Sequence, residues 1–88
     1  MKATAPRPEH APLIAEIEAF LIETEVSASA FSALAMGDPT FVKGVREGRR
    51  MFFDTESKVR AYMGYVRGGG VPAEWLAAWK KKYRMASV

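Results

Sequence analysis

The chain has 88 residues, which is enough for one small domain with a thin core. Hydrophobic residues make up 49% of it, and the absence of cysteine excludes disulfides and thiolate metal sites. The net charge of +3 is unevenly divided, because residues 1–36 carry a net −3 and residues 37–88 a net +6, so the second part is the one suited to bind an anion.

Several classes of protein are not expected from these features. The longest apolar stretches are far below the roughly 20 residues that span a bilayer, and Lys2 and Arg7 are not followed by the apolar run of a signal peptide. We therefore expect a cytoplasmic protein without membrane contact. The single histidine, His10, is expected to be solvated, so no His-based triad or metal cluster is available, and we expect no enzyme, no catalytic residue and no cofactor.

Residues 1–11 contain two prolines and no helical periodicity, so we expect a flexible basic arm there. Lys2 and Arg7 on such an arm could enter a DNA minor groove, although an ordinary disordered terminus is the commoner explanation. Pro12 suits the first turn of a helix, and the apolar spacing from Leu13 to Leu21 predicts a helix over residues 12–24. Its glutamates fall on other faces and are expected to be solvated.

Two short helices with a very short turn between them are predicted next. Ser27 suits the N-cap of a helix over residues 28–35, and Gly37 suits its end. Asp38 and Pro39 are then expected to be the N-cap and first residue of a helix over residues 39–47, closed by Gly48. A turn this short favours a large crossing angle, which is the arrangement of a helix-turn-helix.

The remainder is predicted to be helical as well. The apolar residues of Arg49–Phe53 are expected to turn inward, Thr55 to cap a helix over residues 56–66, and Pro72 to start a helix over residues 72–84. Glycines 68–70 form a flexible break without the Lys-Ser/Thr of a phosphate-binding loop. We thus expect an all-α protein of four to five short helices: a basic arm (1–11), a helix-turn-helix domain (12–67), and a glycine linker with a C-terminal amphipathic, aromatic and basic helix (68–88).

The central segment resembles the lambda-repressor-like helix-turn-helix family. That family has a small residue in the first helix, a glycine four positions on, buried β-branched residues in the recognition helix and a closing glycine. Those places are occupied here by Ala33, Gly37, Val42, Val45 and Gly48. The resemblance covers residues 13–63, although the stretch from Gly37 to Val42 is one residue shorter than is usual in that family. Residues 27–50 also look like small bacterial, partly phage-like, helix-turn-helix proteins with a Gly-Asp-Pro turn.

This resemblance implies a set of DNA contacts. The exposed side of the recognition helix would read bases in the major groove, and the phosphate contacts would come from the start of the preceding helix and from the cations that follow. Phe41 could instead belong to the core. The base-reading residues implied are Thr40, Phe41, Lys43, Gly44 and Glu47, and the phosphate-binding residues implied are Ser27, Ser29, Arg46, Arg49, Arg50 and Lys58.

The C-terminal helix carries Trp75, Leu76, Trp79 and Tyr83 on one face. This face could cap the core, form a homodimer contact, or bind a protein partner or an anionic membrane surface. Our leading expectation is a sequence-specific, double-stranded-DNA-binding regulator of transcription that acts as a dimer or beside a partner. The alternative is a helical interaction module or adaptor that binds another protein, such as part of the transcription machinery, through the Trp75–Tyr83 helix.

Overall fold

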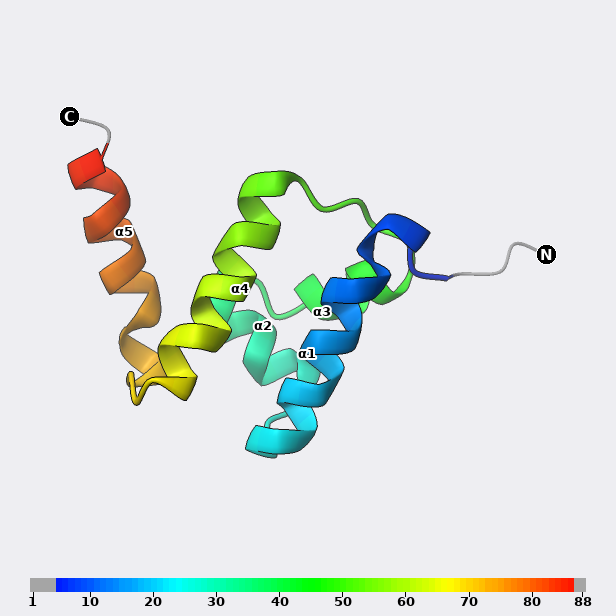
Figure 1. Ribbon diagram of the computed structural model, residues 1–88, viewed down its shortest axis with the longest axis horizontal. Helices are drawn as coiled ribbons and strands as arrows, with labels where there is room; N and C mark the ends of the chain where they lie inside the picture. The colour runs from blue at the N-terminus through cyan, green and yellow to red at the C-terminus, as the bar shows by residue number, and fades with distance from the viewer. Residues whose placement is uncertain (1–4, 87–88) are drawn as a thin grey trace.

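The chain folds entirely into helices over the residues described by the computed structural model, which are 5–86, with side chains described for 5–80. Five α-helices and two 3-10 turns follow in the order η1 (Pro8–His10), α1 (Ala11–Thr24), α2 (Ala28–Met36), α3 (Phe41–Arg46), α4 (Phe53–Arg67), η2 (Pro72–Glu74) and α5 (Trp75–Ala86). In Figure 1, α1 and α4 run in the same direction, with α5 on the far side of α4. The all-α prediction is confirmed.

The core is built around a chain of aromatic rings. Phe20 of α1, Phe31 of α2 and Tyr62 of α4 meet edge to face, with ring centroids 5.3 to 6.1 Å apart. Trp75 of α5 continues the series at 5.6 Å from Tyr62. Since aromatic edge-to-face pairs add to the stabilisation from buried area, these rings join four of the five helices into one core.

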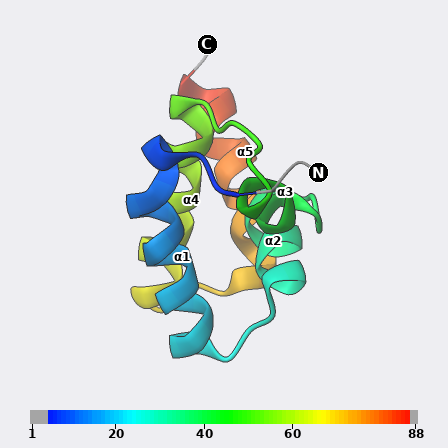
Figure 2. The same ribbon diagram turned by 90° about the vertical axis from the view of Figure 1, so that its right-hand side faces the viewer.

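Helix α2 begins and ends with the capping residues that the sequence predicts. Ser27 caps α2 by accepting a hydrogen bond from the Ala30 N–H at 3.0 Å. Gly37 ends the helix in a left-handed conformation, with φ at 73°, and its N–H donates to the Ala33 carbonyl. In Figure 2, α3 lies directly beyond the end of α2.

Helix α3 is shorter than predicted, because Asp38 makes a turn in place of a helix start. One Asp38 carboxylate oxygen accepts hydrogen bonds from the Thr40 N–H at 3.0 Å and from the Thr40 hydroxyl at 2.7 Å. The Asp38 carbonyl accepts from the Phe41 N–H at 3.0 Å. This is the local bonding of an Asx turn, so Pro39 lies in the turn and α3 begins at Phe41, two residues later than expected.

The segment predicted to be a mobile arm is ordered at its C-terminal end, and His10 is not solvated. The His10 side chain is only 3% exposed, and its Nε2 accepts a hydrogen bond from the Met51 N–H at 2.8 Å. Its Nδ1 is also buried and lies 3.2 Å from a Glu56 carboxylate oxygen without regular hydrogen-bond geometry. The error has a physical cause: the polar atoms of a histidine fit a core position when loop backbone supplies the partner. Lys2 lies outside the described residues.

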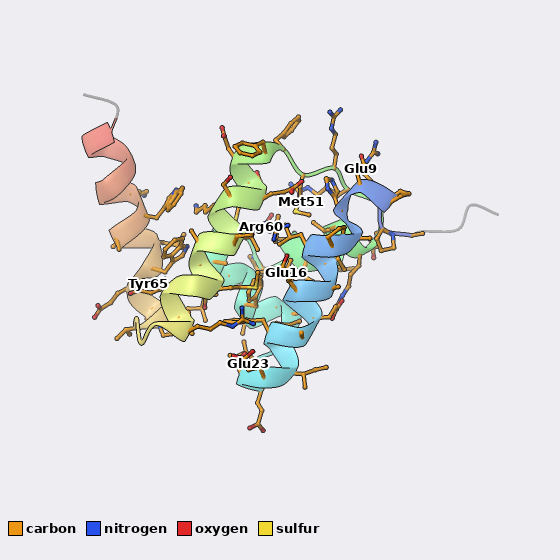
Figure 3. All side chains as sticks on the ribbon, in the orientation of Figure 1. Glu9, Glu16, Glu23, Met51, Arg60 and Tyr65 are labelled. Atoms are coloured by element: carbon orange, nitrogen blue, oxygen red, sulfur yellow. The ribbon has the colours of Figure 1, made fainter. Side chains whose placement is uncertain are left out.

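The loop between α3 and α4 also differs from the prediction. Only Met51 turns inward, where it is 4% exposed, whereas Phe52 and Phe53 are 65% and 80% exposed. Helix α4 begins at Phe53, so Thr55 lies inside its first turn and does not cap it. In Figure 3, Met51 lies on the loop near the start of α1, where its N–H is bonded to the His10 ring.

The glycines 68–70 form a hydrogen-bonded turn, although a flexible linker was predicted. The N–H groups of Gly68, Gly69 and Gly70 all donate to carbonyls of the last turns of α4. Beyond this turn, the Trp75 indole N–H donates to the Ala35 carbonyl at 3.0 Å and attaches α5 to α2. No single helix in the described part is both long and apolar enough to cross a membrane, and only the bent pair Pro8–Thr24 and Ala28–Met36 meets that condition jointly.

Candidate nucleic-acid interface

Helix α3 has one buried side and one open side. Phe41, Val42 and Val45 are 5% exposed or less and hold the helix on the core. Lys43 and Glu47, together with Thr40 just before the helix, are exposed. A small helix with a charged and hydroxyl-bearing open side can present those groups to a ligand while its apolar side fixes its orientation.

Phe41 must be removed from the predicted base-reading set. Its side chain is 5% exposed and packs with Val42 and Val45 in the core. The alternative weighed from the sequence, a core position, is the one that the structure has. Phe41 is four residues before Val45, about one helical turn, so both side chains face the same buried side of α3.

Gly44 is not open to direct approach by a base, because Arg49 occupies the space beside it. A Cβ atom on Gly44 would lie 2.9 Å from the Arg49 Cδ. The Arg49 N–H also donates to the Gly44 carbonyl at 2.9 Å. The predicted close approach is therefore made by a side chain of this protein, and the glycine lets Arg49 lie across α3.

Arg49 and Arg50 are the main exposed cations beside α3. Arg49 contacts one Asp38 carboxylate oxygen at 3.4 Å, which is a long ion pair between groups that are both about half-exposed. Arg50 has no acidic partner among the described residues, and its guanidinium lies 5.4 Å above the Phe52 ring. The hydrogen bonds from the Thr40 hydroxyl and N–H, followed by Arg49, hold the pKa of Asp38 below its ordinary value, so this carboxylate is ionised at neutral pH.

Arg46 is bound to a carboxylate, which argues against its predicted contact with phosphate. Its Nε and one terminal nitrogen donate to the two Glu18 oxygens at 2.8 and 2.6 Å. This two-point pairing is the geometry that arginine also uses for phosphate, so a phosphate would have to displace Glu18. The hydrogen bond lowers the pKa of Glu18 and raises the pKa of Arg46.

The remaining predicted phosphate contacts are dispersed. Lys58 is partly buried on α4, with its ammonium 5.9 Å above the Trp79 ring of α5. Burial, and then the neighbouring charge of Lys80, lowers the pKa of Lys58. Ser27 and Ser29 are exposed at the start of α2, where the Ser27 oxygen already serves as the cap.

A second group of charges lies on the other side of the molecule, between α1 and α4. Glu16 pairs with Arg60, and Glu23 pairs with Arg67 at 3.0 Å. Both pairs have a spacing of seven residues on each helix, which is about two turns, and Figure 3 shows Glu16 and Arg60 pointing toward each other. These glutamates lie on an exposed face, as predicted, but their ion pairs were not foreseen, because the sequence gives no sign that α4 runs alongside α1.

A cavity of about 260 Å³ opens beside α3, at the level of Asp38 and the α3–α4 loop. Its walls combine apolar and polar groups from α2, both connecting segments and the start of α4. They are formed by Met36, Asp38, Phe41, Arg49, Arg50, Phe52 and Thr55. The exposed arginines therefore belong to a hollow surface with an aromatic rim.

The residues predicted for an oligomer or partner contact are divided by the structure. Trp75 is 5% exposed and belongs to the core, so it is not a free contact residue. Leu76 and Trp79 are partly buried, and the side chain of Tyr83 lies outside the described residues. Tyr65, Trp75 and Trp79, with two alanines, line an open groove of about 290 Å³ between α4 and α5.

Two positioning residues were missed in the sequence. Ser32 is fully buried, donates to the Ala28 carbonyl at 2.6 Å and accepts from the Val42 N–H at 3.0 Å, so it ties α2 to the first turn of α3. His10 ties the α3–α4 loop to the start of α1. The usable signal for Ser32 was its place beside Phe31 on the apolar side of α2, whereas His10 gave none.

The described residues include no cluster of three or more histidine, aspartate and glutamate side chains that could hold a metal ion. Comparison of the chain with protein-family models, with curated proteins and with solved structures gave no match.

Proposed function

We propose that this chain is a sequence-specific DNA-binding regulator of transcription, in which α2 and α3 act as a helix-turn-helix and α3 enters the major groove. The observation that carries the proposal is the two-sidedness of α3. Its apolar side is fixed on the core, and its open side presents Thr40, Lys43 and Glu47 next to the exposed Arg49 and Arg50. Lysine and threonine can contact base edges, and carboxylates can accept from cytosine.

In this proposal the contacts have different tasks. Arg49 and Arg50 bind phosphates and set the position of the protein on the duplex without reading its sequence. Lys43 and Thr40 supply the base preference. Arg46, held by Glu18, stabilises the placement of α3 on α1 and takes no phosphate.

The proposal is tested by selecting bound duplexes from a random DNA pool and measuring affinity for the recovered sequence as salt is raised. With the two phosphate contacts of Arg49 and Arg50, affinity should fall by about tenfold between 50 and 200 mM salt. Substitution of Lys43 or Thr40 by alanine should then change the recovered sequence. A protein that binds no duplex at low ionic strength would contradict the proposal.

A second candidate function is an adaptor that binds another protein through α5. The groove beside Trp79 favours it, because Lys58 and Lys80 are near this groove and form no ion pair with any described residue. A partner with acidic and apolar side chains would suit such a surface. The apolar part of such a contact does not weaken as salt is raised, so this complex should lose less affinity than one held only through phosphates, which separates this function from DNA binding.

A further inference from the structure

Two consecutive phenylalanines, at the end of the α3–α4 loop and the start of α4, have exposed rings. Phe52 is 65% and Phe53 is 80% exposed, whereas every other phenylalanine of the chain is buried. Two exposed rings next to each other are costly in water, and contiguous exposed apolar groups on a small protein are often a contact surface. The two phenylalanines follow Arg49 and Arg50 in the chain, separated from them by the buried Met51.

The outward position of these rings is imposed by the structure around them. Met51 is buried on one side of the loop, and its N–H is bonded to the His10 ring at 2.8 Å. On the other side, the Phe52 carbonyl accepts from the Glu56 N–H at 3.0 Å, as part of the first turn of α4. Phe52 is thus held between two anchored points, and its ring projects from a supported backbone.

The surroundings of Phe52 have the chemistry of a base-stacking site. The flat Arg50 guanidinium lies 5.4 Å from the centre of the ring. The ring also borders the cavity of about 260 Å³, whose polar wall includes the Asp38 carboxylate and Thr55. Aromatic rings and guanidinium groups stack on nucleobases, and adjacent arginines bind the phosphates that accompany them.

An intact duplex hides the faces of its bases, so a stacking site of this kind needs a base that has left the stack. Protein side chains that insert at a base step pay the cost of unstacking and gain contact area in return. That cost is smallest where the base is unpaired already.

We propose that Phe52 and Arg50 form a stacking site for one unstacked nucleobase of the DNA that α3 binds. This inference rests on the proposed DNA-binding function and adds to it a preference for DNA with a kinked or unpaired step beside the α3 contact. The Phe52 ring stacks on the base, and Arg50 beside the ring and Arg49 bind the phosphates of that nucleotide. Exposed rings of this kind can also bind a second copy of the chain, and the molecular mass of the protein in solution distinguishes that contact from base stacking.

The test uses two probes of the same mixed sequence at low salt: a fully paired duplex and a duplex with a one-nucleotide bulge of the fluorescent base 2-aminopurine. The wild-type protein should bind both probes, should bind the bulged probe about tenfold more tightly, and should quench its fluorescence, since stacking is worth about 1–3 kcal/mol per base. Phe52→Ala should remove the preference and the quenching, and Phe52→Trp should retain both. Ile22→Ala, at a residue of α1 that is 79% exposed, is the control and should change neither.

The outcomes separate the two proposals. If the wild type binds both probes equally, without quenching, and Phe52→Ala behaves in the same way, the stacking site is wrong while DNA binding stands. If the wild type binds neither probe, both proposals fail. If Phe52→Ala lowers the molecular mass of the protein in solution, the ring is a contact between copies, and the stacking site is again wrong.

Discussion

The two sides of the molecule use arginine in different ways. Between α1 and α4, Arg60 and Arg67 are each held by a glutamate of α1. Beside α3, Arg50 has no acidic partner among the described residues, and Arg49 has only a long contact with Asp38. The net charge therefore says little about where an anion binds, because Arg60 and Arg67 are neutralised locally by glutamates, whereas Arg49 is neutralised only weakly and Arg50 has no described acidic partner.

The sharpest test of this comparison uses two double variants, one that removes the two arginines beside α3 and one that removes the two arginines between α1 and α4. Arg49→Ala with Arg50→Ala should lower DNA affinity by at least about a hundredfold, since each hydrogen bond to a charged group is worth about 1.5–3 kcal/mol. It should also flatten the salt dependence by about one unit of slope for each lost contact. Affinity measured by fluorescence anisotropy over a salt series gives both values.

The matched control is Arg60→Ala with Arg67→Ala, which removes the same charge from the α1–α4 side. It should leave affinity within a few-fold of the wild type at moderate salt, because screening weakens distant charges. Equal losses in the two double variants would mean that only overall charge matters and that the division between the two sides is wrong.

Ser32 holds α3 in place on α2, and α3 carries the side of the molecule with the exposed arginines. Ser32→Ala leaves the Val42 N–H without a partner in the core and should lower the free energy of unfolding by about 1–3 kcal/mol. Ser29→Ala, three residues earlier and exposed, should change it by less than about 0.5 kcal/mol. Chemical denaturation measures both, and comparable values would remove Ser32 from its positioning role.

The ion pairs between α1 and α4 can be removed one at a time without changing a core residue. Glu16→Gln or Glu23→Gln should each lower the free energy of unfolding by no more than about 1 kcal/mol, because these ion pairs lie at the solvent-exposed surface. Each change also releases an arginine. DNA affinity should stay unchanged for the recovered sequence, and a clear rise would show that this side also faces the duplex.

The smallest expected effect is on the stability of the protein at low pH. The pKa of Asp38 is lowered in the folded protein from its ordinary value of 3.8, by the Thr40 hydroxyl first, then by the Thr40 N–H and Arg49. Its contribution to stability is therefore complete above pH 3.8 and is lost as the pH falls through the lower folded value. Asp38→Asn should flatten the fall of the melting temperature below that pH, and an identical curve for the variant and the wild type would contradict this contribution.

The sequence was informative where a local pattern decides the structure. The periodicity of Leu13 to Leu21, the Ser27 cap and the Gly37 stop predicted α1 and α2 to within about one residue. The start of α3 was missed because Asp38 can serve a turn as well as a cap, and both uses satisfy nearby N–H groups. The burial of His10 was out of reach, because its partner Met51 is 41 residues away in the chain.

The candidate site was predictable in part for the same reason. Thr40, Lys43 and Glu47 are exposed as the helical period of α3 requires. Arg46 has the same period, but its partner Glu18 is 28 residues away, so no local pattern could show that it is occupied. The exposure of Phe52 was equally hidden, because two phenylalanines in a loop are ordinarily core residues.

The two ion pairs between α1 and α4 also restrict the length of α4, because both form only when the arginines are seven residues apart. An extra residue inserted in α4 between Arg60 and Arg67 would turn everything beyond it by about 100° and carry Arg67 away from Glu23, even with Arg60 still in place. We therefore expect insertions within α4 to be poorly tolerated, and changes of length to be accepted at the exposed turn of Gly68 and Gly69, which both pairs leave free.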